Sequence, residues 1–189
     1  MRYLVVILIA LGAASAAAAQ EDALWGALRA GGHVALIRHA GTVGGSGDPP
    51  GFKLDDCSTQ RNLTLKGRNE ARRLGEMFRV QEVAVGKVMS SQWCRCIETV
   101  ALMGLPPPEF APTFNNAFTL RERVEELTAG ARAVVADWNG PGTLIVMTHG
   151  ANILPLTGIM PEEGGVVVVK GDRDSPRKLR VLGRIAMQP

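Results

Sequence analysis

Short apolar runs alternate with amphipathic stretches along most of the chain, and this alternation constrains the fold more than any other feature. Apolar runs bounded by glycine or polar residues predict five strands, at residues 33–39, 85–91, 142–150, 164–172 and 178–187. Helical spacing of apolar residues predicts helices between them, at residues 22–30, 64–80, 92–104, 120–138 and 151–159. Such an order is typical of a three-layer α/β/α sandwich with a largely parallel central sheet.

Length and charge limit what the domain can be. The chain has 189 residues, enough for one domain with a substantial core. Its formal net charge is only +3, and its basic residues are dispersed. A nucleic-acid partner is therefore not expected, since such binders gather Lys and Arg on one face. A mild positive bias is compatible with small anionic substrates.

The first twenty residues form a separate segment. "MRYLVVILIALGAASAAAAQ" has a basic start at Arg2, an apolar run over residues 3–11, and an Ala-x-Ala pattern at residues 17–19. This layout predicts a secretory signal peptide over residues 1–20, with a domain at 21–189 in the periplasm or outside the cell. An uncleaved anchor is the alternative, but the apolar stretch is short for a span. We therefore expect no stable membrane span after cleavage.

Export would permit a disulfide. Three cysteines are present, and Cys57 could pair with either Cys94 or Cys96. On a helix, Cys94 and Cys96 point to different faces, so they cannot both meet Cys57. Three buried free thiols are the alternative.

Three predicted strands end in unusual polar residues. The first delivers Arg38 and His39, the third delivers His149, and Arg95 falls in the first turn of the helix after the second strand. Ligands of open α/β sheets bind beyond the carboxyl ends of the strands. A cation in a first helical turn opposes the helix dipole, so the sequence predicts an anion between that helix start and Arg95. Two arginines can fork around phosphate oxygens, while two imidazoles can supply a nucleophile and a donor.

Four segments resemble the histidine phosphatase superfamily, the phosphoglycerate-mutase-like group. "LIRHAGT" resembles its Arg-His-Gly signature, "RNLTLKGRNEARRLG" its Leu-Thr-x-x-Gly segment, "SSQWCRCIETV" its Ser-Ser-x-x-x-Arg block, and "IVMTHGANI" its His-Gly strand end. All four occur in the family's order, within residues 33–153. The resemblance is to small exported bacterial-type members, which implies few insertions over the site and an open pocket.

The resemblance implies a role for each matching residue. His39 would be the nucleophile that takes a phosphoryl group from a substrate and passes it to water. Arg38 and Arg95 would hold the phosphoryl oxygens, and His149 would stabilise the group in transfer. Thr42 and Arg61 would be further substrate-binding residues. Such an enzyme needs no metal and no cofactor, because the donors are preorganised.

The chain departs from the family pattern in two places. Ala40 replaces the glycine after the first histidine, which is a modest change if its backbone torsion is ordinary. The general acid is also missing: Gly150 follows the second histidine, and Asn115 and Asn116 stand where a loop carboxylate is expected. Displaced candidates are Glu109, Glu122, Glu162 and Glu163. Without an acid we expect a substrate with a good leaving group, such as a phosphoramidate.

The sequence leaves other interpretations of these residues open. A catalytically weak phosphate-recognition module with the same fold is the main alternative to the enzyme. The expected partner is a small phosphorylated substrate or a phosphorylated envelope component, for which a lipopolysaccharide-core heptose phosphate is one family analogy. "GTVGGSGDPPG" lacks the Gly-Lys-Ser/Thr ending of a nucleotide loop. His33 is expected to be a structural residue, and the histidine spacing argues against a metal hydrolase.

Overall fold

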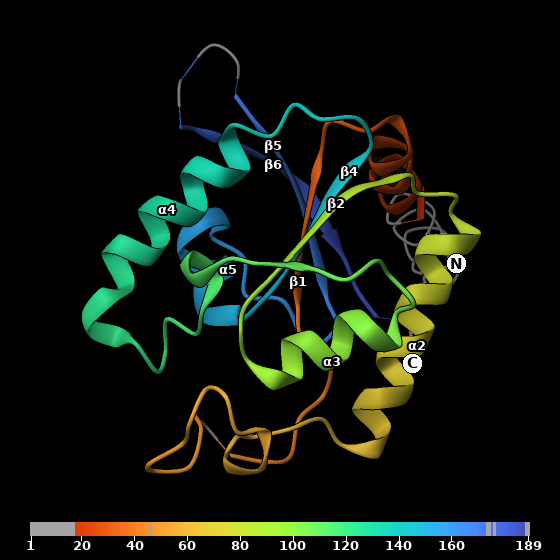
Figure 1. Ribbon diagram of the computed structural model, residues 1–189. Coiled ribbons are helices and arrows are strands. Elements are labelled where there is room, and N and C mark those ends of the chain that lie inside the picture. The colour runs from red at the N-terminus through yellow and green to blue at the C-terminus, as the bar shows by residue number, and fades with distance from the viewer. Residues whose placement is uncertain (1–17, 46, 173–174, 176, 188–189) are drawn as a thin grey trace, which may run out of the picture.

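A computed structural model describes residues 18–45, 47–172, 175 and 177–187 (Figure 1). The predicted signal peptide lies almost wholly outside these residues, so its existence and cleavage stay predictions. Among the described residues, no helix has both the length and the apolar character needed to cross a bilayer.

The centre of the protein is one six-stranded sheet with strand order β3-β2-β4-β1-β5-β6. The strands are β1 (Val34–Arg38), β2 (Val85–Ser90), β3 (Glu109–Phe110), β4 (Thr143–Thr148), β5 (Val166–Gly171) and β6 (Leu179–Ile185). The four strands β3, β2, β4 and β1 run parallel to one another, β5 runs antiparallel to β1, and β6 runs antiparallel to β5. All five predicted strands are confirmed, and β3 is an addition in a segment for which the sequence predicts no strand or helix.

Helices fall where apolar residues repeat at helical spacing. Residues 18–30 are helical, followed by α2 (Leu65–Val80), α3 (Cys94–Leu102), α4 (Val124–Ala136) and α5 (Gly150–Thr157). Thr64 caps α2 by accepting a hydrogen bond from the Gly67 amide at 2.9 Å. The long helix predicted over 120–138 divides into a 3-10 turn (Arg121–Arg123) and α4. Pro155 does not interrupt α5, which ends at Gly158 in the left-handed conformation.

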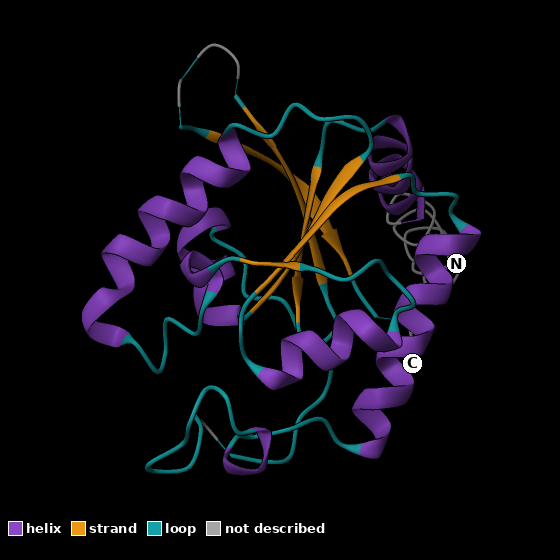
Figure 2. Cartoon of the chain, in the orientation of Figure 1, coloured by secondary structure: helices purple, strands orange, loops and turns teal. Residues whose placement is uncertain are grey.

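The sheet is covered on both faces, as the all-apolar strands require (Figure 2). On one face, Ala35 and Ile37 of β1 pack in a core with the helix of residues 18–30, α2 and α3. On the other face, Val34 and Leu36 pack in a core with α4 and α5. Alternate residues of one strand thus serve opposite layers, which confirms the three-layer α/β/α sandwich.

The register between β1 and β4 brings the two strand-end histidines together. Arg38 lies beside Thr148 in this parallel pair. The residue after each is a histidine, and the His39 amide donates to the Thr148 carbonyl at 3.0 Å. Because the register is fixed by apolar pairs along both strands, His39 and His149 must emerge side by side at the carboxyl edge of the sheet.

A disulfide ties the long loop of residues 41–63 to the start of α3. It joins Cys57 to Cys94, the first helical residue, while Cys96 is buried and free. Cys96 faces inward, with its Sγ 3.7 Å from the Thr148 carbonyl oxygen. The choice between the two cysteines follows from these opposite orientations. In Figure 1 this loop lies below α3, beyond the lower ends of β1, β2 and β4.

Candidate active site

A hollow of about 320 Å³ opens at the carboxyl ends of β1 and β4. It brings together five of the six residues expected at the site, which are Arg38, His39, Arg61, Arg95 and His149. The other described lining residues are Gly45, Gly47, Asn116, Phe118, Gly150, Ala151 and Met160. Segments more than 100 residues apart in sequence therefore converge on one cationic cavity.

The His39 ring is oriented by a contact between its Nδ1 and the backbone of the next residue. The side chain is buried, and its Nδ1 lies 2.9 Å from the Ala40 carbonyl oxygen. A carbonyl can only accept, so we assign the proton to Nδ1 and the lone pair to Nε2. Burial, followed by the charge of Arg95, lowers the pKa of His39 to about 3. The imidazole is therefore neutral at neutral pH, as a nucleophile requires. Ala40 itself has no positive φ, so an alanine is not strained at the position where the similar motif has glycine.

The His149 ring is held through its other ring nitrogen, Nε2. Its Nε2 lies 2.9 Å from the Ser91 hydroxyl and 3.6 Å from the Cys96 thiol. We assign the Ser91 hydroxyl as the donor to Nε2, which places the proton on Nδ1, an atom with no partner among the described residues. Burial, followed by the charges of His39 and Arg95, holds the pKa of His149 well below its usual value. The two rings lie 5.3 Å apart between centroids, in an edge-on arrangement.

Arg95 is fully buried and already has an anionic partner. Its Nη1 and Nη2 donate to the two carboxylate oxygens of Asp48 at 2.7 and 3.3 Å, and the Asp48 side chain is 0% exposed. Burial opposes ionisation of Asp48, but hydrogen bonds from Arg95, Arg61 and Trp93 outweigh it and lower its pKa. The pair is therefore ionised at neutral pH.

The anion expected between the start of α3 and Arg95 is thus a group of the protein itself. Asp48 takes the guanidinium, and the Gln60 side-chain oxygen accepts from the Cys94 amide at 3.0 Å. An anion does lie beside Arg95, as the sequence predicts, but the protein supplies it without a substrate. The start of α5 also lies at the cavity, where Gly150 and Ala151 are lining residues.

Arg38 and Arg61 supply the remaining positive charge. Arg38 Nη1 donates to the Pro161 carbonyl at 3.0 Å, and its Nη2 lies 3.7 Å from Glu163. Arg61 Nη1 donates to the Gly45 carbonyl within the loop. Burial, followed by the charge of Arg95, lowers the pKa of Arg61. Both guanidinium groups are therefore held in place by the protein before any substrate arrives.

Thr42 is the sixth expected residue, and it is not among the residues that line the cavity. Its hydroxyl donates to Glu163 at 3.0 Å. Of the four displaced acid candidates, Glu163 lies 3.7 Å from Arg38 of the site, whereas Glu109 pairs with Lys87 at the edge of the sheet. Among the lining residues that the structure describes, none carries a carboxylate.

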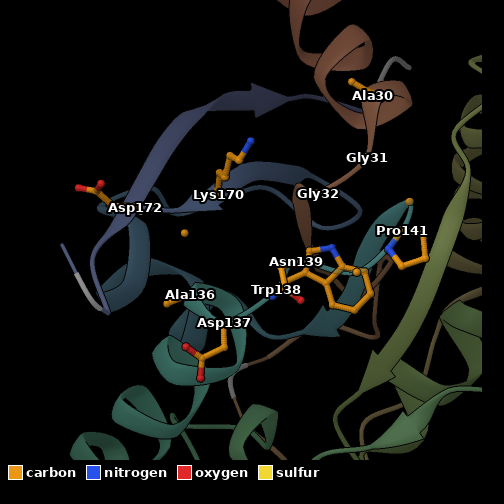
Figure 3. A pocket seen from close by; sticks show the side chains of 13 residues that line it. Ala30, Gly31, Gly32, Ala136, Asp137, Trp138, Asn139, Pro141, Lys170 and Asp172 are labelled. Atoms are coloured by element: carbon orange, nitrogen blue, oxygen red, sulfur yellow. The ribbon is translucent and has the colours of Figure 1, made fainter. Parts of the chain in front are cut away.

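A larger hollow, of about 770 Å³, lies at the opposite end of the sheet. Figure 3 shows Trp138 between Asn139 and Pro141 in this hollow, with Lys170 on β5 nearby. Neither histidine of the site is there. His33 also lies at this end of β1, where its Nδ1 is 2.8 Å from the Gly31 carbonyl oxygen. That contact fits the structural role expected for His33.

Sequence reasoning missed two residues that shape the site. Asp48 lies in the Gly- and Pro-rich stretch "GTVGGSGDPPG", and its contact with Arg95 spans 47 residues. Ser91 directly follows β2, and its hydroxyl contacts His149 across 58 residues. Ser91 belongs to the Ser-Ser-x-x-x-Arg block, but neither its contact with His149 nor that of Asp48 with Arg95 has a local signal, because each joins distant segments.

Solved structures share this fold, although no family model matches the sequence and no curated protein matches it. The protein histidine phosphatase SixA complexed with tungstate has a TM-score of 0.59 at 18% identity, over 82% of this chain and 96% of that one. A phosphoserine phosphatase from Entamoeba histolytica has a TM-score of 0.57 at 13% identity, over 82% and 98%. A mycobacterial glucosyl-3-phosphoglycerate phosphatase has a TM-score of 0.53 at 14% identity, over 79% and 96%. At such identities the likeness establishes the fold.

Proposed function

We propose that this protein is a histidine phosphatase, which transfers a phosphoryl group from a substrate to His39 and then to water. The fold is shared with structures described as phosphatases of phosphohistidine, phosphoserine and a sugar phosphoglycerate. The four residues that the motifs single out, Arg38, His39, Arg95 and His149, all line one cavity. A fold by itself does not imply a function, so the proposal depends on the site.

The observation that carries the proposal is a set of three buried N–H groups without partners. Among the described residues, four buried side-chain polar atoms lack a hydrogen-bond partner. Three of them, Arg61 Nε, Arg95 Nε and His149 Nδ1, belong to residues that line this cavity. Leaving buried donors unsatisfied costs about 1–3 kcal/mol each. A phosphoryl group has three oxygens that can accept from such donors, and it would lie beside the His39 ring.

The proposed reaction has two steps, and in each step one bond to phosphorus forms while another breaks. First, the lone pair on His39 Nε2 attacks phosphorus, and the bond from phosphorus to the leaving group breaks. The leaving group departs with the electron pair, and His39 becomes a cationic phosphohistidine whose Nδ1–H still donates to the Ala40 carbonyl. Second, a water oxygen attacks phosphorus and the Nε2–P bond breaks. Inorganic phosphate leaves, one proton passes to solvent, and His39 returns to its neutral form.

Trapping of the covalent intermediate tests this function directly. We expect an aryl phosphate quenched during turnover to leave an acid-labile, base-stable phosphate on the protein, which peptide mapping places on His39. Phosphate on a serine, on aspartate or on His149 would contradict the proposal. Phosphate binding without turnover and without a phosphoprotein would instead identify the phosphate-recognition module, which the lack of a lining carboxylate also fits.

The leaving group is expected to decide the rate. A general acid typically contributes roughly 10²–10⁴-fold, and no described lining residue carries a carboxylate. We therefore expect kcat/KM for p-nitrophenyl phosphate to exceed that for glycerol phosphate by about 10³-fold or more. Comparable rates would show that an acid is present, and loss of the alkyl activity alone in Glu163→Gln would identify it.

Two half-exposed apolar side chains, Phe118 and Met160, line the cavity beside the arginines. They would give an apolar leaving group a contact surface, which supports aryl phosphates as well as phosphoramidates of imidazole type. The openness expected of a small member would also admit a phosphorylated envelope component.

We also propose that the protein acts in the periplasm or outside the cell. The pattern of the first twenty residues supports this location, as does the Cys57–Cys94 disulfide, because structural disulfides persist in oxidising compartments. Fractionation of cells that produce the full chain would test the location, and sequencing of the mature N-terminus would test the cleavage of the signal peptide.

A further inference from the structure

The Asp48 carboxylate has more hydrogen bonds than an incidental ion pair would need. It accepts from Arg95 Nη1 and Nη2, from the Trp93 indole Nε1 at 2.8 Å, and from the Arg61 amide at 3.0 Å. Its side chain is 0% exposed, and that of Arg95 is 1% exposed. Four donors on two oxygens fix the carboxylate on every side, so it is a permanent part of the site.

This contact decides which edge of Arg95 is free. Both terminal nitrogens face Asp48, and Nη1 also donates to the Arg61 carbonyl at 3.2 Å. The Nε–H is buried and without a partner among the described residues. Arg95 therefore cannot offer its terminal fork to a phosphoryl group while Asp48 is in place. It can offer only the Nε edge.

The contact also sets the charge of the cavity. Paired with Asp48, Arg95 adds no net charge, so the excess positive charge comes from Arg38 and Arg61. Displacement of Asp48 by a phosphate dianion would break four hydrogen bonds and leave two anions in one buried space. Asp48 is also an unsuitable general acid, because its pKa is lowered and its oxygens face donors.

The loop that carries Asp48 is attached to the helix that carries Arg95. The Cys57–Cys94 disulfide joins the loop to the residue before Arg95, and Gln60 bonds the Cys94 amide. Asp48, Arg61 and Arg95 thus belong to one cross-linked unit. A guanidinium on a side chain with four rotatable bonds would otherwise sample many orientations.

From these contacts we propose that Asp48 is a positioning residue for phosphoryl transfer, which holds the Arg95 guanidinium so that its Nε edge faces the phosphoryl group. This inference rests on the proposed function and adds to it the residue that orients the second arginine. A buried ion pair is weak evidence for stability, since an apolar replacement is often as stable. The orientation of Arg95 gives the pair a functional reason.

A double-mutant cycle tests this role. We expect Asp48→Asn to lower kcat for p-nitrophenyl phosphate about 10²-fold, since a misplacement near 1 Å costs about that much. KM should change little, because the contact matters most in the transition state. In the Arg95→Gln background the same substitution should cost less than about threefold, since Asp48 then has no guanidinium to orient. Asp55→Asn, an exposed carboxylate in the same loop, is the matched control and should leave kcat unchanged.

The outcomes separate this inference from the proposed function. An equal loss in both backgrounds, or no loss in either, would show that Asp48 does not act through Arg95. If Asp48→Asn does not fold, Trp93→Phe takes its place, because it removes one of the four donors to Asp48. We then expect a smaller loss of kcat, and an equal loss in both backgrounds or no loss in either would again contradict the role. Calorimetric titration with inorganic phosphate gives a second readout of the cycle. A wild-type chain with neither turnover nor phosphate binding overturns the function, and this inference with it.

Discussion

Replacing His39 by alanine is expected to abolish turnover of p-nitrophenyl phosphate, with a loss of at least roughly 10³-fold in kcat. The reason is that the substitution removes the nucleophile itself while the arginine cradle stays intact. Inorganic phosphate should therefore still bind, with an affinity within a few fold of wild type. Steady-state kinetics and calorimetry on the same preparation measure both quantities.

His33 supplies the control for this experiment. It is the remaining histidine of the chain, and it lies at the far end of β1 with its Nδ1 on the Gly31 carbonyl. His33→Ala should keep full turnover. If His39→Ala retained more than about a tenth of the wild-type rate, the chemistry would have to proceed by direct attack of water, and the covalent route would be wrong.

Replacing His149 by alanine is expected to lower kcat by about 10²–10³-fold, the usual cost of removing one preorganised donor from a developing charge. The substitution removes the Nδ1–H, for which the described part of the chain offers no partner, and it leaves the His39 nucleophile in place. The phosphoenzyme should therefore still form, only more slowly, which rapid-quench labelling can follow.

Labelling of the phosphoenzyme therefore distinguishes the roles of the two histidines. Loss of all labelling in His149→Ala would make His149 the nucleophile and would contradict the assignment of Nδ1 as a donor. A loss below threefold would show that the donor is dispensable. Ser91→Ala provides a milder companion, because it removes one group that can donate to Nε2 and leaves the ring in place. We expect it to lower kcat by less than His149→Ala does.

Much of the fold was predictable because its signals are local. The run from Val34 to Ile37 is apolar at every position and short, which indicates a strand buried on both faces. Thr64 followed by apolar residues at helical spacing marked the start of α2. The strand-end residues Arg38, His39 and His149 were also visible, because a charge directly after a buried run needs a partner.

Other parts of the site could not be predicted, because they depend on how distant segments meet. The disulfide could have involved either Cys94 or Cys96, and the direction in which α3 leaves the sheet decided between them. Thr42 was expected at the phosphate because of its place after the first motif, but its hydroxyl faces Glu163 across 121 residues. No spacing rule relates residues so far apart.

The sequence by itself determined the layered α/β architecture and the group of arginines and histidines at one edge of the sheet. Hydrophobic periodicity and the parallel register sufficed for this, since both act through neighbouring residues and paired strands. Only the tertiary structure decided the partners of that group: Asp48 on Arg95, Ser91 on His149 and Glu163 on Thr42. A buried charge or imidazole must be satisfied by whatever donor or acceptor the packed loops bring within about 3 Å, and that depends on the path of the whole chain.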